Sequence, residues 1–248
     1  VYAAELADPE EGRSAVVRVL DWYLDRAAKA VAAVETGADP GDRDAAAGWL
    51  EAERRNLVAA TRLAAASGLH EHAWRLPDAV WRHWFTLGLV DDWTAAHEVG
   101  LASARALGDV RAQAAMLNGL GVAHPTAQRH TDALHAYEQA SALWEELGDD
   151  AGAARTSTNI AIVHYLTGHY RDAVEHGDRV LALRLHQDDA FGEAVAHTAL
   201  GGFHLRLGDP ARARVTWRKS PERFVAAYRV YGAAERSTRE RNQSRQSS

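Results

Sequence analysis

The hydrophobic and small residues of this chain recur at the three- and four-residue spacing of amphipathic helices. Between residues 130 and 147, the apolar side of one such run comprises Ala133, Tyr137, Ala140, Leu143 and Trp144. Charged residues such as Glu138 and Glu145 fall on the opposite side, toward water. No segment alternates with the period of two that marks a half-buried strand, so the pattern predicts an all-α chain.

The helical pattern repeats every forty residues. The segments "LNGLGVAH" from Leu117, "STNIAIVH" from Ser157 and "HTALGGFH" from His197 align without gaps. The copies share four kinds of position. The apolar residues are Leu120, Ile160 and Leu200, and the small residues that follow them are Gly121, Ala161 and Gly201. The histidines are His124, His164 and His204, and the alanines are Ala133, Ala173 and Ala213. A degenerate earlier copy contains Val80, Trp81, Trp84 and Trp93. The sequence therefore predicts about three and a half repeats.

Each repeat is predicted to be a hairpin of two helices. The segment "LGD" ends helices at 107–109 and 147–149, and it has decayed to Gln187–Asp189 in the next copy. One hairpin cannot bury its apolar face alone, so neighbouring hairpins must stack into a TPR-like α-solenoid. We expect Gly121 to approach Ala133 closely within its hairpin, while Tyr137 and Trp217 fill the gap to the next hairpin.

The predicted boundaries are a helical cap over 1–67, repeats at 68–107, 108–147, 148–187 and 188–219, a terminal helix at 220–235 and a disordered tail at 236–248. The cap is expected to hold one helix over 13–35 and a second that Asp44 caps and that runs to Ala66. Its buried stripe is predicted to be Trp49, Leu50, Leu57, Val58 and Leu63. Pro125 is expected to stop its helix near Ala123 or to kink it, with an irregular turn over 126–129.

The order apolar, small, aromatic, alanine, aromatic, alanine resembles the tetratricopeptide repeat (TPR). In one copy these positions are Leu120, Gly121, His124, Ala133, Tyr137 and Ala140. The period of forty and the "LGD" ending resemble the TPR arrays of bacterial NB-ARC (STAND) transcriptional regulators, including the antibiotic regulatory protein group. The segments at 18–31 and 46–84 are similar to the stretch that precedes the repeats in that family. The resemblance covers residues 1–218.

The resemblance implies a protein-interaction or sensor module of a signal-responsive regulator. Such a regulator needs a phosphate-binding G-x-x-x-x-G-K-[ST] loop and a DNA-binding helix, and this sequence contains neither. Because the chain begins at Val1 without a start methionine or signal peptide, we expect it to be a fragment whose ATPase and DNA-binding parts lie before Val1. The expected partner is a protein, a peptide or another domain of the parent protein.

In the resembled family, the first helix of each hairpin lines a concave groove. Matched residue by residue, the groove positions of this sequence, together with two tryptophans of the first repeat, are Trp81, Arg82, Trp84, Asn118, Val122, Arg155, Asn159 and Arg206. Tryptophan and arginine dominate binding hot spots, which suits a recognition surface. Two alternatives stay open: a small-molecule sensor with a Trp-lined pocket, and a structural spacer or homo-oligomerisation module.

Composition narrows the chemistry. The chain has no cysteine, so no thiol nucleophile or cysteine-ligated metal site exists in it. His124, His164 and His204 lie in successive repeats, too far apart for one zinc ion, and the paired acidic residues suit helix ends. We therefore predict no catalytic, cofactor or metal site. The net charge of −6 argues against direct nucleic-acid binding, and no apolar run is long enough for a membrane span. The expected location is the cytoplasm.

Overall fold

A computed structural model of the chain describes residues 9–36, 39–126 and 129–219, without the side chains of 124–126. Regular secondary structure in these ranges is entirely α-helical, in eleven helices, which confirms the predicted all-α class. The chain forms two compact units, Val1–Leu147 and Gly148–Ser248, called the N-terminal and C-terminal units below. The predicted terminal helix at 220–235 and the tail at 236–248 lie outside the described residues.

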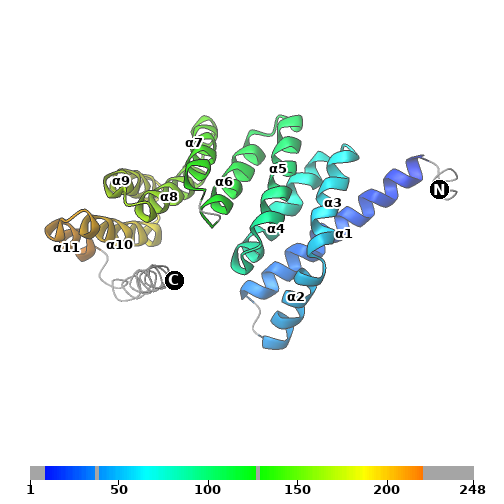
Figure 1. The fold of residues 1–248 in the computed structure, drawn as a ribbon, viewed down its shortest axis with the longest axis horizontal. Helices are drawn as coiled ribbons and strands as arrows, with labels where there is room; N and C mark the ends of the chain where they lie inside the picture. Colours follow the sequence, from blue (N-terminus) through cyan, green and yellow to red (C-terminus); the bar gives the residue numbers. More distant parts are fainter. Residues whose placement is uncertain (1–8, 37–38, 127–128, 220–248) are drawn as a thin grey trace, which may run out of the picture. The chain divides into compact units, whose positions relative to one another are not determined.

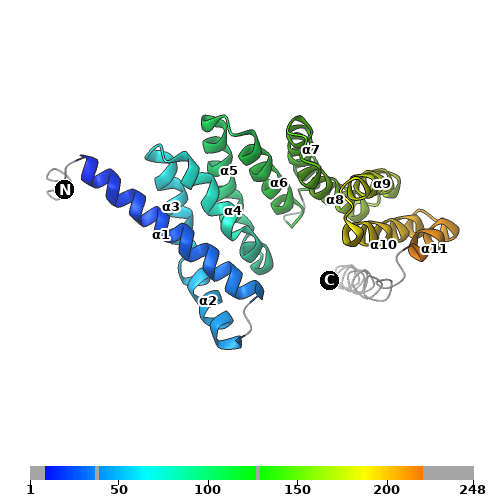
Figure 2. The same ribbon diagram turned by 180° about the vertical axis from the view of Figure 1, so that it is seen from behind.

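The N-terminal unit contains seven described helices, drawn from blue to green in Figure 1. Their bounds are α1 (Pro9–Thr36), α2 (Pro40–Ala52), α3 (Arg54–Ala66), α4 (His70–Leu87), α5 (Val90–Leu107), α6 (Val110–Thr126) and α7 (His130–Glu146). Helices α4 and α5 form one hairpin, and α6 and α7 form the next. Helix α1 packs against α2 and α4, while α3 packs against α4 and α5, as the reverse view in Figure 2 also shows.

The C-terminal unit contains four described helices. They are α8 (Asp150–Leu166), α9 (Tyr170–His186), α10 (Ala190–Arg206) and α11 (Pro210–Arg218). Each helix packs against the next one along the chain, with α8 against α9, α9 against α10 and α10 against α11. The helix pairs therefore fall at the predicted period of forty residues.

The "LGD" segments both end one helix and begin the next. Gly108, Gly148 and Gly208 adopt φ values of 67°, 61° and 87°, in the left-handed region that glycine enters without steric cost. The aspartate that follows each glycine accepts a hydrogen bond from a backbone N–H in the first turn of the next helix; these aspartates are Asp109, Asp149 and Asp209.

The turn at Gln187–Asp189, which lacks the "LGD" sequence, still ends one helix and begins the next. Asp188 takes the place of glycine with φ of 52°, and it is the one non-glycine residue with positive φ among the described residues. Asp189 then accepts a hydrogen bond of 2.8 Å from the backbone N–H of Gly192. The turn geometry is conserved although its glycine is not, because aspartate tolerates the left-handed conformation better than most residues.

The N-terminal cap differs from its prediction in three respects. Asp39, rather than Asp44, caps α2, because Pro40 provides the fixed φ of a first helical residue. The expected long helix is divided at Glu53 into α2 and α3. Leu63 is 44% exposed, so it does not belong to the buried stripe, and Trp49 is half-buried.

Two predictions about packing also need correction. Helix α6 runs to Thr126, so it does not stop near Ala123; the φ of proline is itself helical, and a final turn loses only one hydrogen bond there. The rings of Tyr137 and Trp217 lie against Gly121 and Gly201 of their own hairpins. A glycine leaves the space that a large ring needs, so these rings pack within the hairpin.

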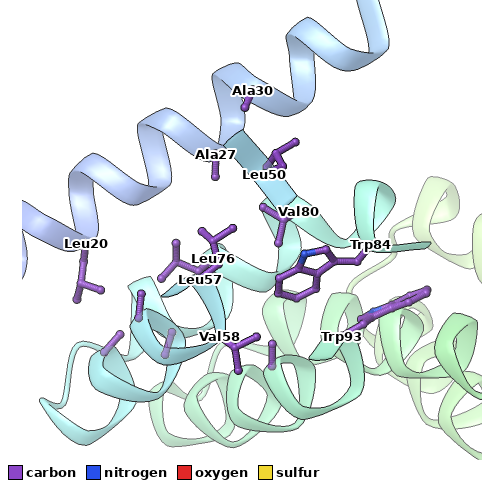
Figure 3. Close-up of a cluster of buried hydrophobic side chains, with 14 of the residues drawn as sticks. Leu20, Ala27, Ala30, Leu50, Leu57, Val58, Leu76, Val80, Trp84 and Trp93 are labelled. Atoms are coloured by element: carbon purple, nitrogen blue, oxygen red, sulfur yellow. The ribbon is translucent and has the colours of Figure 1, made fainter. Parts of the chain in front are cut away.

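The core of the N-terminal unit joins all of its first five helices (Figure 3). Its buried residues include Leu20 and Ala27 of α1, Leu50 of α2, Leu57 and Val58 of α3, Leu76, Val80 and Trp84 of α4, and Trp93 of α5. The predicted cap therefore shares one hydrophobic core with the first hairpin, and burying that face accounts for the amphipathic pattern of α1 and α3.

Candidate functional site

One face of α8 and α10 in the C-terminal unit carries exposed and half-buried residues in equivalent positions. On α8 the face consists of Arg155, Asn159, Ile162 and Leu166, which follow one another at intervals of four, three and four residues. On α10 the residues forty positions later are Val195, Ala199, Gly202 and Arg206. Ile162, Leu166 and Val195 are 43%, 58% and 45% exposed. This exposed face, named the α8/α10 face, combines apolar and cationic groups.

Arg206 is held at the end of this face by tyrosines. Its guanidinium donates to the hydroxyl oxygen of Tyr170 on α9, with Nη2 at 2.7 Å. The guanidinium carbon also lies 5.2 Å from the ring centre of Tyr170 and 6.0 Å from that of Tyr165. These cation–π contacts and the hydrogen bond to Tyr170 hold the guanidinium in place at the end of the α8/α10 face.

A hollow of about 190 Å³ opens beside the α8/α10 face. Its walls are mainly small and apolar, and come from Ala161 of α8, Gly177 and Val180 of α9, and Val195, Ala199 and Phe203 of α10. Thr158, Arg184 and Asp189 add polar groups to the lining. Arg184 and Asp189 are paired at 3.1 Å, so their charges are already balanced.

A second hollow, of about 480 Å³, lies between α1 and α4 in the N-terminal unit. Asp21, Asp25 and Asp78 give it an acidic lining next to Trp74. Asp21 contacts His72 at 2.9 Å, and Asp25 forms an ion pair of 2.8 Å with Lys29. Arg75 also lines this hollow, and Asp21 and Asp25 already have partners on the protein, so the acidic groups are not all available to a ligand.

The predicted groove residues of the N-terminal unit have different surroundings. Trp84 is completely buried, so it belongs to the core and not to a groove surface; the prediction that it lines a groove is wrong. Asn118 is only 6% exposed. Val122 and Trp81 are half-buried against the same core. Arg82 is exposed, with its guanidinium 5.4 Å from the ring centre of Trp81 and 3.7 Å from Glu35.

Trp81, Trp84 and Trp93 of the first repeat pack into the core of the N-terminal unit, while Trp74 lines the hollow between α1 and α4. Trp93 is fully buried, with its ring centre 6.0 Å from those of Trp81 and Phe85 and 5.9 Å from that of His97. Aromatic rings at these separations stabilise a core beyond their buried area alone. The arrangement gives no support to the Trp-lined ligand pocket.

Several histidines are buried as neutral bases. His97 is fully buried, and its Nδ1–H donates to the carbonyl oxygen of Trp93 at 3.1 Å. Burial lowers its pKa to about 4, because a charged imidazolium loses hydration in the core. Burial also lowers the pKa of His176, and the neighbouring His164, stacked at 5.6 Å between ring centres, lowers it further. Within the described ranges, no cluster of three or more histidine or acidic side chains could hold a metal ion.

The predicted site residues did not include the exposed apolar residues beside the hollow. Phe191 is 59% exposed on α10, one helical turn before Val195. Aligning the repeats would have drawn attention to Phe191, because the equivalent residue one repeat earlier is Ala151, and a large apolar residue replaces a small one there. Of the predicted site residues, Arg155 and Asn159 of α8 and Arg206 at the end of α10 belong to the α8/α10 face of the C-terminal unit.

Comparison with known proteins agrees with this architecture. Residues 112–186 match the family model described as the tetratricopeptide repeat, so the chain contains a TPR region. The crystal structure of BtubC (BKLC) from P. vanneervenii is similar in fold, with a TM-score of 0.61 and 17% sequence identity. The match covers 89% of this chain and 92% of that chain. A search of curated protein sequences found no match.

The fold is therefore an all-α helical repeat of the TPR type. TPR repeats generally mediate protein–protein interaction through surfaces that stacked hairpins expose. None of the helices in the described ranges is long and apolar enough to cross a membrane.

Proposed function

We propose that this chain is the protein-interaction and sensor module of a bacterial NB-ARC-type transcriptional regulator. In this proposal it works in the cytoplasm and binds a peptide or protein partner without chemically transforming it. The resemblance of residues 18–31 and 46–84 to the segment before the repeats of such regulators supports the parent class. Partner binding would bias a nucleotide-controlled switch located elsewhere in the regulator.

The observation that carries the proposal is the composition of the α8/α10 face. Exposed Ile162, Leu166 and Val195 would cost hydration free energy on a surface that stays uncovered, and they lie in register with Arg155 and Arg206. Arginine is among the residue types enriched where binding energy concentrates, and the exposed aliphatic side chains supply apolar area that a partner can cover. The buried rings of Trp84 and Trp93 give the small-molecule alternative no comparable surface.

The proposal is tested by purifying the complete regulator, with an affinity tag, from its native host after cross-linking, and identifying bound proteins by mass spectrometry. We expect the double variant Arg155→Glu/Arg206→Glu to lower the yield of the specific partner by at least about tenfold, since charge reversal opposes encounter and binding. The matched control is Arg171→Glu, an exposed arginine on α9 outside this face. That variant should leave the yield unchanged.

The regulatory part of the proposal needs a separate readout. A transcriptional reporter should lose its response to the inducing signal when the α8/α10 face is altered, with the amount of regulator unchanged. If no specific partner is enriched, and if the reporter responds normally after residues 112–219 are deleted, the sensor function is excluded.

A further inference from the structure

Four equivalent positions along the chain, spaced forty residues apart, are His97, Tyr137, Gly177 and Trp217. Three of them carry an aromatic ring, and each ring occupies the space beside a glycine. The ring of His97 lies where a side chain on Gly119 would point, Tyr137 lies against Gly121, and Trp217 lies against Gly201. Tyr137 and Trp217 cover a glycine on the preceding helix of their own hairpin, and His97 covers one on the following helix, α6.

The third copy has no such ring. Gly177 stands at the ring position, and the 190 Å³ hollow opens directly beside it. Two further residues of the wall are alanines at positions where other repeats have a ring-covered glycine. Ala161 is equivalent to Gly121 and Gly201, and Ala199 is equivalent to Gly119. Leu200 and Phe203 of α10 occupy the direction in which a side chain on Gly177 would point, since a Cβ there would lie 2.7 Å from the Cδ2 of Leu200 and 3.4 Å from that of Phe203. The hollow therefore borders both the ring position that is glycine in this copy and Ala161, the residue equivalent to the glycines that Tyr137 and Trp217 cover.

The size of the hollow limits what it can hold. An apolar cavity of about 150 Å³ accommodates a benzene molecule. Pockets for drug-sized ligands are larger, about 300–1,000 Å³. A volume of about 190 Å³ therefore suits one aromatic ring and is too small for most complete ligands.

The border of the hollow favours a ring that arrives on another chain. Phe191 and Val195 are 59% and 45% exposed at the edge, so a docking side chain would remove their apolar surface from water. Val195 and Ala199 belong at once to the hollow and to the α8/α10 face. A polypeptide lying on that face has direct access to the hollow.

We propose that the hollow between α8, α9 and α10 binds one aromatic side chain of the partner polypeptide, which supplies the ring that Gly177 lacks. This inference rests on the proposed function, because it names the chemistry of the partner for the same face. A tryptophan, tyrosine or phenylalanine of the partner would be the anchor, and the arginines of the face would contact its flanking residues.

The test titrates the full chain with three probes and follows the methyl resonances of Ala161, Val180 and Ala199 by NMR. The probes are the capped peptides acetyl-Gly-Trp-Gly-amide and acetyl-Gly-Leu-Gly-amide, and free indole. We expect saturable shifts with the tryptophan peptide and at least about tenfold weaker binding of the leucine peptide. Indole should compete for the same site without binding more tightly than the tryptophan peptide.

Three variants locate the binding. Ala199→Leu should fill the hollow and abolish the shifts of Ala161 and Val180, with helix content checked by circular dichroism. Phe191→Ser alters an exposed residue, so it keeps the fold and should weaken binding severalfold. The matched control is Val215→Ser on α11, which is 57% exposed and lies outside the hollow; it should bind like the parent chain.

The possible results separate the alternatives. Absence of saturable shifts, or shifts that persist in Ala199→Leu, would overturn the proposal. Binding of indole alone would assign the hollow to a free small molecule and likewise overturn it. The yield of the cross-linked partner separates this proposal from the proposed function. If that yield falls in Arg155→Glu/Arg206→Glu but is unchanged in Ala199→Leu and Phe191→Ser, the partner does not use an aromatic anchor in the hollow, while the proposed function stands.

Discussion

The indole ring of Trp217 lies directly over Gly201, and its Nε1–H donates to the carbonyl oxygen of Thr198 at 3.1 Å. This contact joins α11 to α10 by both packing and a hydrogen bond. The relationship depends on glycine, because a methyl group on Gly201 would overlap the ring. Gly201 and Gly121 are therefore positions at which a small residue admits a ring from the same hairpin.

Gly201→Ala should lower the free energy of unfolding by about 1–3 kcal/mol, since overpacking forces the ring or the helix to move. Gly202→Ala is the matched control: nothing lies within 4 Å of its added methyl group. That change should raise stability by about 0.5–1 kcal/mol through helix propensity. Urea unfolding followed by circular dichroism measures both, and equal effects would contradict the packing argument.

Asp188→Gly should stabilise the turn between α9 and α10. Asp188 adopts φ of 52°, where a side chain is strained, while the glycines of the equivalent turns are not. We expect a gain of up to about 1 kcal/mol, reduced by the greater freedom of glycine in the unfolded chain. Gly148→Ala at the equivalent position, with φ of 61°, should destabilise. Thermal unfolding of both variants gives the comparison, and a loss of stability in Asp188→Gly would refute it.

The buried His97 should make stability depend on pH. Its pKa is about 4 in the folded chain and about 6.5 when exposed, so between these values the unfolded state binds more protons. Stability is therefore complete above about pH 7 and falls by up to about 3 kcal/mol as the pH decreases to 4. His97→Gln should flatten the dependence of the unfolding free energy on pH in this range.

The control for this effect is the exposed His135, whose change to glutamine should leave the slope as it is. His83, His176 and His197 also have pKa values lowered chiefly by burial, so some acid sensitivity remains in His97→Gln. A slope identical to that of the parent chain would show that His97 does not carry the effect.

Trp84 and Trp22 should respond differently to truncation. Trp84 is fully buried, and Trp84→Ala should cost about 3–5 kcal/mol through lost burial and a cavity. Trp22 is 52% exposed on α1, so Trp22→Ala should cost less than about 1 kcal/mol. Denaturant unfolding of the two variants decides whether the first-repeat tryptophans are core residues, and a small effect for Trp84→Ala would restore the surface interpretation.

Helix positions and the hairpin period were accessible from the order of residues. The forty-residue spacing of Leu120, Ile160 and Leu200 is a local property, because apolar residues three and four apart share one helix face whatever lies opposite. The break at Glu53 and the cap at Asp39 were not predicted. Several polar residues in that segment suit a helix start equally well, so the local sequence does not select one of them.

Burial and cavities followed from contacts between helices distant in the chain. Nothing in the spacing of Trp81, Trp84 and Trp93 tells which ring faces the core, because that depends on the helices of the cap that cover them. The hollow beside Gly177 likewise arises from three helices, two of which have small residues where their equivalents meet a ring. Close packing is a property of the assembled interior, so an unfilled space becomes visible only when the neighbouring helices are in place.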